Sequence, residues 1–121
     1  MSFDIQLYRT ETKQRQKASG NDQFFDNEEN LVPFTDEQFQ SLKERLLEYD
    51  YVLESDKPGE VQLSHDEYNI KALLTRRGLY FTAGWDQGSM FEAGMTASEL
   101  TDSGEFEKYD PQNGGWEEIE G

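Results

Sequence analysis

The sequence predicts an α+β domain, in which an antiparallel sheet of about six to seven strands packs with one main helix at residues 35–49. Two observations support this class. Several short segments alternate apolar and polar residues and are separated by turn residues, and only one segment carries a strong helical repeat. Sequential strands joined by short turns form antiparallel sheets. At 121 residues, with 13% aromatic residues and three prolines, we treat residues 1–121 as one folded domain.

The N-terminal segment begins with a strand. Residues 3–9, FDIQLYR, alternate strictly, so one side of the strand is apolar. The next stretch, TETKQRQKASGNDQ at residues 10–23, is polar without a repeat, and we expect a loop. A short helix near residues 21–28, capped by Asn21 or Asp22, would bring two phenylalanines into the core.

The helix at residues 35–49 has the clearest local signals. Thr35 and Gln38 form a capping box, whose hydroxyl and amide satisfy free backbone N–H groups. Phe34 and Phe39 occupy the positions of a hydrophobic staple. The apolar face then continues at helical spacing through Phe39, Leu42, Leu46 and Tyr49.

The rest of the chain has the pattern of strands. The predicted strand segments are YVLES, EVQLSH, EYNIKALLT, GLYFTAGW, EFEKYD and GWEEIE. Turns are expected at Pro58-Gly59, at Gly78 and at Asn113-Gly114. Residues 89–97 fit either a strand or a helix, and the period-two alternation of their apolar residues favours a strand.

Acidic residues dominate the charge and accumulate toward the C-terminus. The chain holds 26 acids and 11 bases, a net charge of −15. Residues 78–121 contain ten acids and a single base, Lys108, whereas residues 1–20 are net positive. Such a field repels nucleic acid and anionic membranes and attracts basic proteins. We therefore nominate as partner-binding residues Asp86, Glu92, Glu99, Asp102, Glu105, Glu107, Asp110, Glu117 and Glu118. The basic N-terminal stretch should lie on the opposite side.

The composition offers little for catalysis or for cofactor binding. There is no cysteine, and the single histidine, His65, is expected at the surface or in a turn. The acids at residues 22–29 lack the spacing of a calcium loop, and no glycine-rich phosphate loop is present. We expect no catalytic residue, no metal and no cofactor. Without a signal-peptide pattern or an apolar run long enough to cross a membrane, we expect a cytoplasmic monomer.

The chain resembles small acidic bacterial DNA-mimic proteins, a family that includes binders of the histone-like protein HU. The resemblance lies in three segments, FDIQLYR, NLVPFTDEQF and GMTASELTDSGEFEKYDPQNGGWEEI. The resemblance covers most of the chain and implies an HU-like basic partner, competition with DNA and no active site. Carboxylates two residues apart on a strand lie about 6.6 Å apart, whereas duplex DNA carries one charge per about 1.7 Å. Two or three neighbouring acidic segments are therefore needed, and we expect them at about residues 86–92, 99–107 and 110–120.

Two other classes of function remain open. An immunity or antitoxin-type protein would also be small and acidic, but it would bind one toxin through a few buried aromatic anchors and would depend less on salt. An enzyme is the third possibility. It would place carboxylates with shifted pKa values in a cleft.

Overall fold

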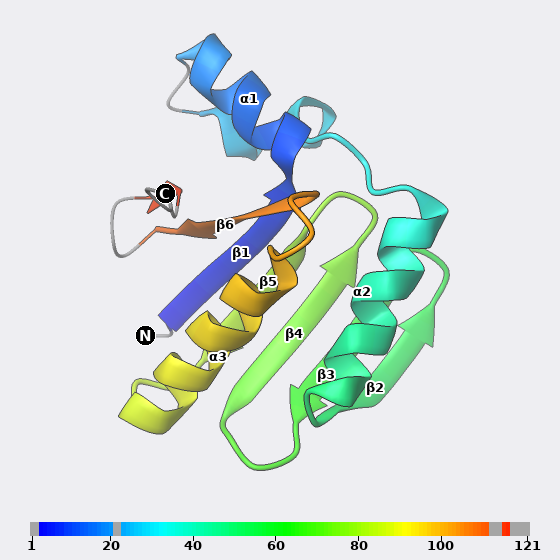
Figure 1. Cartoon of the computed structure of the whole chain (residues 1–121), viewed down its shortest axis with the longest axis vertical. Helices are drawn as coiled ribbons and strands as arrows, with labels where there is room; N and C mark the ends of the chain where they lie inside the picture. Colours follow the sequence, from blue (N-terminus) through cyan, green and yellow to red (C-terminus); the bar gives the residue numbers. More distant parts are fainter. Residues whose placement is uncertain (1–2, 21–22, 112–114, 117–121) are drawn as a thin grey trace.

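Seven strands form one antiparallel sheet in the order β2-β3-β4-β5-β1-β6-β7 (Figure 1), which confirms the predicted α+β class. The computed structural model describes residues 3–20, 23–111 and 115–116. The strands are β1 (Phe3–Arg9), β2 (Tyr51–Lys57), β3 (Glu60–His65), β4 (Ile70–Thr75), β5 (Leu79–Ala83), β6 (Phe106–Asp110) and β7 (Gly115–Trp116). The first strand therefore lies in the interior of the sheet, between β5 and β6.

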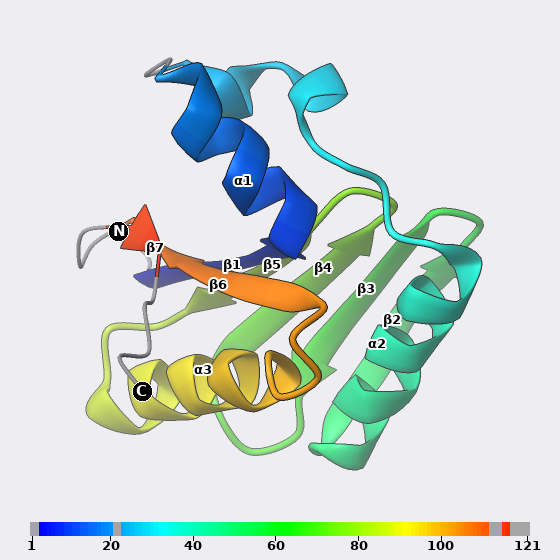
Figure 2. The ribbon, with the colours of Figure 1, turned by 45° about the horizontal axis from the view of Figure 1, so that its top comes forward.

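The helices lie on both faces of the sheet (Figure 2). They are α1 (Thr10–Ser19), α2 (Asp36–Glu48) and α3 (Gln87–Leu100), with two short 3-10 turns, η1 (Phe24–Asp26) and η2 (Glu28–Asn30). Figure 2 shows α2 and α3 together on one face, with α1 on the other side of β1 and β6. Among the described residues, no helix is both long and apolar enough to cross a membrane.

The main core lies between the sheet and the two helices α2 and α3. It contains the buried alternate residues of β1, β3, β4 and β5 together with Leu42, Leu46, Ala93, Ala97 and Leu100. A second, aromatic cluster fills the opposite face around Tyr8 of β1. Ile5 and Leu7 face the main core and Tyr8 faces the aromatic cluster, as the predicted alternation of the first strand requires.

Helix α2 confirms the prediction for residues 35–49. The Thr35 hydroxyl accepts a hydrogen bond from the backbone N–H of Gln38 at 3.0 Å, and the Gln38 side chain accepts one from the backbone N–H of Thr35 at 3.0 Å. Leu42 and Leu46 are fully buried against the sheet. A capped amphipathic helix is thus specified by its own residues.

The polar stretch after the first strand is a helix, so the expected loop is wrong. Helix α1 buries only Thr12, and its sequence therefore shows no apolar repeat. Contacts elsewhere in the chain hold it. The Thr12 hydroxyl accepts a hydrogen bond from the backbone N–H of Val32 at 2.9 Å, and the indole N–H of Trp116 donates to Gln16 Oε1 at 3.0 Å. The expected short helix near residues 21–28 is present as η1, where Phe24 is buried. Asn21 and Asp22 lie outside the described residues.

Residues 89–97 lie within helix α3, so the favoured strand is wrong. The buried residues of this helix are Ser89, Ala93, Thr96, Ala97 and Leu100, a helical spacing made mostly of small side chains. The largest apolar side chains of the segment point outward. The buried face therefore could not be recognised from the spacing of large apolar residues in the sequence. Gly88 and Gly94 lie inside the helix and do not mark turns.

The predicted hairpins are confirmed where the structure describes them. Strands β2 and β3 pair across Pro58-Gly59, β4 pairs with β5, and β6 pairs with β7. Gly59 has a φ of +75°, which suits the turn. The predicted Asn113-Gly114 turn falls outside the described residues.

Candidate functional surface

Helix α3 carries the first of the nominated acids, and local hydrogen bonds fix its beginning. Asp86 is the N-cap, and its carboxylate accepts a hydrogen bond from the backbone N–H of Ser89 at 2.9 Å. Hydrogen bonds from Ser89 lower the pKa of this exposed carboxyl group. The buried Ser89 hydroxyl in turn accepts from the backbone N–H of Asn69 at 3.0 Å, which ties the helix to the loop before β4. Asp86 thus has a structural role.

Asp102 follows the end of α3 and pairs with α2. Its two carboxylate oxygens accept hydrogen bonds from the Arg45 guanidinium at 2.9 and 3.2 Å. Arg45 also donates to the backbone carbonyl of Glu99 at 3.2 Å, so one side chain connects the two helices. The hydrogen bond from Arg45 lowers the pKa of Asp102.

Glu105 and Glu107 contact different helices and do not share one face. Glu105 precedes β6 and accepts a hydrogen bond from the Gln38 amide of α2 at 3.3 Å. Glu107 lies 3.7 Å from Lys13 of α1, on the other side of the sheet. Between them, Phe106 enters the main core. The acids near β6 therefore contribute to two different surfaces.

Glu92 faces the only histidine, His65, which ends β3 directly before a turn. We expected this histidine at the surface or in a turn, and the structure buries its side chain. Its side chain is 3% exposed, and its Nε2 atom is 3.8 Å from Glu92 Oε1. The Nδ1 atom accepts hydrogen bonds from the backbone N–H groups of Glu67 and Tyr68, so in this geometry the proton belongs on Nε2. Burial follows from packing between the rings of Tyr51 and Tyr68.

The remaining nominated acids are dispersed. Glu99 is exposed near the C-terminal end of α3, and Asp110 is the last residue of β6. Glu117 and Glu118 lie outside the described residues. The nominated acids therefore do not form one continuous patch. The expected set of three neighbouring acidic strands is wrong for residues 86–92, which contain the beginning of α3, and for residues 99–105, which are the end of α3 and the turn before β6.

The acids gather instead on α2, on α3 and on the residues directly beside them (36–50 and 86–105), which we call the helical face. Residues 36–50 and 86–105 together hold ten acids and two bases. Both bases are engaged, because Lys43 binds Asp56 at 2.6 Å and Arg45 binds Asp102. Glu44 and Glu48 of α2 are not among the nominated acids. Glu37, Glu44 and Glu48 are all exposed.

Helix α1 provides the contrast. It holds three bases and one acid, and Figure 2 shows it across the sheet from α3. Two neighbouring residues of β6 depart from this contrast, because the acid Glu107 approaches Lys13 of α1 whereas the Lys108 ammonium donates to the carbonyl of Gly94 in α3 at 3.1 Å. The basic stretch thus lies across the sheet from α3, on the opposite side as the sequence predicted (Figure 2).

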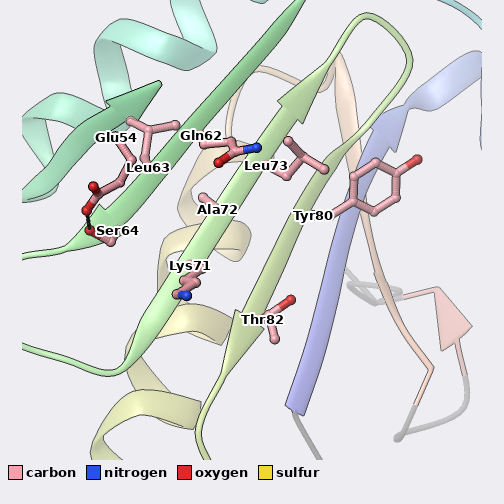
Figure 3. A pocket seen from close by; sticks show the side chains of 9 residues that line it. All are labelled: Glu54, Gln62, Leu63, Ser64, Lys71, Ala72, Leu73, Tyr80 and Thr82. Atoms are coloured by element: carbon pink, nitrogen blue, oxygen red, sulfur yellow. Dashed lines mark hydrogen bonds between the residues drawn. The ribbon is translucent and has the colours of Figure 1, made fainter. Parts of the chain in front are cut away.

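The uncovered part of the sheet, over β2 to β5, forms a second candidate site (Figure 3). It is an open hollow of about 470 Å³, lined mainly by polar side chains. Glu54 and Lys71 are its charged groups, and the Ser64 hydroxyl donates a hydrogen bond to Glu54. Burial raises the pKa of Tyr80 at its edge.

The described residues contain no group of three or more histidine, aspartate or glutamate side chains that could hold a metal ion. The two carboxyl groups with clearly shifted pKa values, Asp86 and Asp102, are both exposed and both lowered by structural partners. Neither is a carboxyl group in a cleft with the raised pKa of a general acid. These observations lend no support to the enzyme hypothesis.

No protein-family model, curated protein or solved structure matches this chain.

Proposed function

We propose that this protein is a DNA mimic, which occupies the DNA-binding site of a basic, HU-like bacterial protein with its helical face. The observation that carries the proposal is the excess of acids in the segments of the helical face. Ten acids and two internally paired bases lie in the segments of one face, and the basic helix α1 lies on the other. A face of one sign concentrates the field toward a partner of opposite sign.

The spacing of the exposed acids on α2 suits this role in part. Glu37, Glu44 and Glu48 are seven and four residues apart, which corresponds to about 10 and 6 Å along a helix. One strand of duplex DNA carries a phosphate every 3.4 Å or so, so one helix is too sparse. Glu99 of α3 adds a carboxylate next to α2, because its backbone carbonyl accepts a hydrogen bond from Arg45 of that helix. The face would therefore imitate the field of DNA, and long lysine and arginine side chains would adapt to its spacing.

The test is the affinity for purified bacterial HU, measured at two salt concentrations with duplex DNA as the competitor. We expect binding that DNA displaces and that weakens steeply with salt, because the contacts are between charges. An absence of binding at low salt would contradict the HU assignment.

Two variants with equal charge locate the interface. The first neutralises the helical face, with Glu37→Gln, Glu44→Gln, Glu48→Gln and Glu99→Gln. The second neutralises four exposed acids away from it, with Asp26→Asn, Glu28→Gln, Glu29→Gln and Glu60→Gln. We expect the first to weaken binding about tenfold or more and the second to have little effect. Equal losses would show that net charge alone attracts the partner.

An immunity or antitoxin-type inhibitor is the second candidate, and the exposed aromatic residues next to and within α3 favour it. Trp85 is 49% exposed and Phe91 is 70% exposed. Aromatic anchors of this kind dominate tight protein–protein interfaces. An inhibitor would hold its toxin at a salt concentration that releases a DNA-binding protein, so the salt dependence of partner affinity separates the two proposals.

A further inference from the structure

The outward side of α3 is more apolar than a solvent-exposed helix surface requires. Phe91 and Met95 lie one turn apart and are 70% and 38% exposed. The inward side of the same helix is built from Ala93 and Ala97, which are fully buried. A helix that buries alanine and exposes phenylalanine and methionine is unusual for a free surface and typical of a contact site.

A shallow hollow lies between these side chains. It has a volume of about 400 Å³, and its lining residues are Met90, Phe91, Gly94, Met95, Ser98 and Lys108, which we call the α3 strip. Gly94 leaves room for a guest atom, because a Cβ placed there would meet only the Lys108 ammonium, at 3.6 Å. That ammonium is held by the Gly94 carbonyl at 3.1 Å and by the Ser98 hydroxyl at 3.0 Å.

The charges around the strip identify the kind of partner. Residues 86–105 hold five acids and neither lysine nor arginine, and Glu92 and Glu99 belong to the same helix as the strip. A second copy of this chain would bring two acidic helices together, at a net charge of −15 on each molecule. An anionic membrane would be repelled for the same reason.

We propose that the α3 strip binds an apolar side chain carried by a lysine- or arginine-rich protein segment, whose cations pair with the acids of the helical face. The inference deepens the proposed function, and it rests on that function only in taking the partner to be basic. Methionine side chains adapt to the shape of a guest, which suits a shallow hollow. Apolar burial is not screened by salt, so the strip supplies the affinity that remains when the charge contacts are weakened.

The test uses two synthetic peptides of equal charge. One is a lysine-rich amphipathic helix with a stripe of leucine, and the other has alanine in place of each leucine. Binding to the full chain is followed by the methyl NMR signals of methionine, because two of the three methionines, Met90 and Met95, line the strip. We expect the leucine peptide to shift both signals and to bind about tenfold or more tightly than the alanine peptide. Salt should weaken both peptides and leave the ratio of their affinities unchanged.

Three variants separate the strip from the general charge. Phe91→Ser removes an exposed side chain, and Gly94→Leu fills the hollow, so each should bring the affinity ratio close to one. Val52→Ser is the control, because Val52 is 50% exposed on β2 and lies outside the strip. Urea unfolding of each variant shows that the fold is retained. Gly94→Ala, which replaces glycine inside a helix without a close contact, should raise stability while it weakens the leucine peptide.

Several outcomes overturn the inference. Equal affinity for the two peptides, or methionine signals that do not move, would show that the strip binds no apolar guest. A concentration-dependent dimer in sedimentation, lost in Phe91→Ser, would assign the strip to a second copy. If the protein did not bind HU but still preferred the leucine peptide, the result would contradict the proposed function and leave this inference standing.

Discussion

Asp86 shows how a single carboxylate can look like a partner contact in the sequence and serve the fold in the structure. It caps a helix that has no other acid in its first turn. The carboxylate accepts hydrogen bonds in its charged form, and this is why its pKa is lowered. A lowered pKa means that the folded protein favours the ionised group, and so the cap stabilises the fold at neutral pH.

We expect Asp86→Ala to lower the urea midpoint of unfolding at pH 7, because the backbone N–H of Ser89 loses its acceptor. The stabilisation by Asp86 is present above the ordinary aspartate pKa of 3.8 and is lost as the pH falls through the lowered folded value. The difference between the wild type and the variant should therefore shrink below pH 3.8. Urea unfolding over a pH series measures it.

Asp86→Asn is the matched control, since the amide oxygen also caps a helix and does not titrate in this range. At pH 7 the urea midpoint of Asp86→Asn should therefore lie closer to that of the wild type than the midpoint of Asp86→Ala does. A gap between wild type and Asp86→Ala that stays constant down to the lowest pH would show that the ionised carboxylate is not the source of the stabilisation.

His65 is a second case at the scale of the residue. Its position at a strand-to-turn boundary suggested exposure, and of the residues that pack against it Tyr68 is close in the sequence whereas the others are distant. Tyr51 comes from β2 and Glu92 from α3, and both approach His65 only because the sheet and the helix pack together. Burial of a polar residue by distant elements cannot be inferred from the residues beside it.

At the scale of the element, α2 and α3 differ in how their sequences encode them. Helix α2 buries leucines and has a capping box, so its repeat is visible in the sequence. Apart from Leu100, helix α3 buries only serine, threonine and alanines, and its Phe91 and Met95 are on the outside. Large apolar residues on the solvent-exposed side of α3 obscured its helical repeat in the sequence. The same residues belong to the α3 strip.

Two leucines of α2 test this packing. Leu42 is fully buried, whereas Leu47 is 41% exposed on the same helix. We expect Leu42→Ala to lower the free energy of unfolding by about 2 to 5 kcal/mol, because it removes apolar contacts and leaves a cavity. Leu47→Ala should change it by less than about 1 kcal/mol, since water already reaches that side chain. Chemical denaturation measures both, and similar losses would mean that α2 does not lie on the sheet as described.

At the scale of the whole molecule, a net charge of −15 on 121 residues opposes folding. Like charges repel in the compact state, and salt screens this repulsion because the Debye length falls from about 30 Å at 0.01 M to about 8 Å at 0.15 M. We expect the urea midpoint to rise over this range of sodium chloride. Partner affinity should fall over the same range, so salt would act on folding and on binding in opposite directions.

The variant that neutralises Glu37, Glu44, Glu48 and Glu99 provides the comparison, with a net charge of −11 in place of −15. Its urea midpoint should rise less with salt, because fewer repulsive contacts remain to be screened. A midpoint that is independent of salt in the wild type would show that the acids are too far apart, or too well paired, to strain the fold.

Much of the architecture could be predicted because it depends on neighbours in the sequence. The alternation of residues 3–9, the capping box at Thr35 and the turn at Pro58-Gly59 each specify an element by local geometry. The charge gradient could also be read directly. This gradient showed that acids are in excess near the C-terminus, but it did not include α2 in the candidate surface. The number of charges along the sequence cannot show that α2 and α3 cover the same face of the sheet.

The sequence by itself determined the α+β class, the main helix, the pairing of consecutive strands and the acidic character of the molecule, since each follows from local periodicity or from composition. The tertiary structure decided that α1 and α3 are helices, that β1 lies between β5 and β6, and that Glu105 and Glu107 belong to different surfaces. The physical reason is common to these cases. Helix α1 is polar on all sides and α3 buries small residues, so contacts from distant segments stabilise them, and such contacts leave no periodic signal in the sequence.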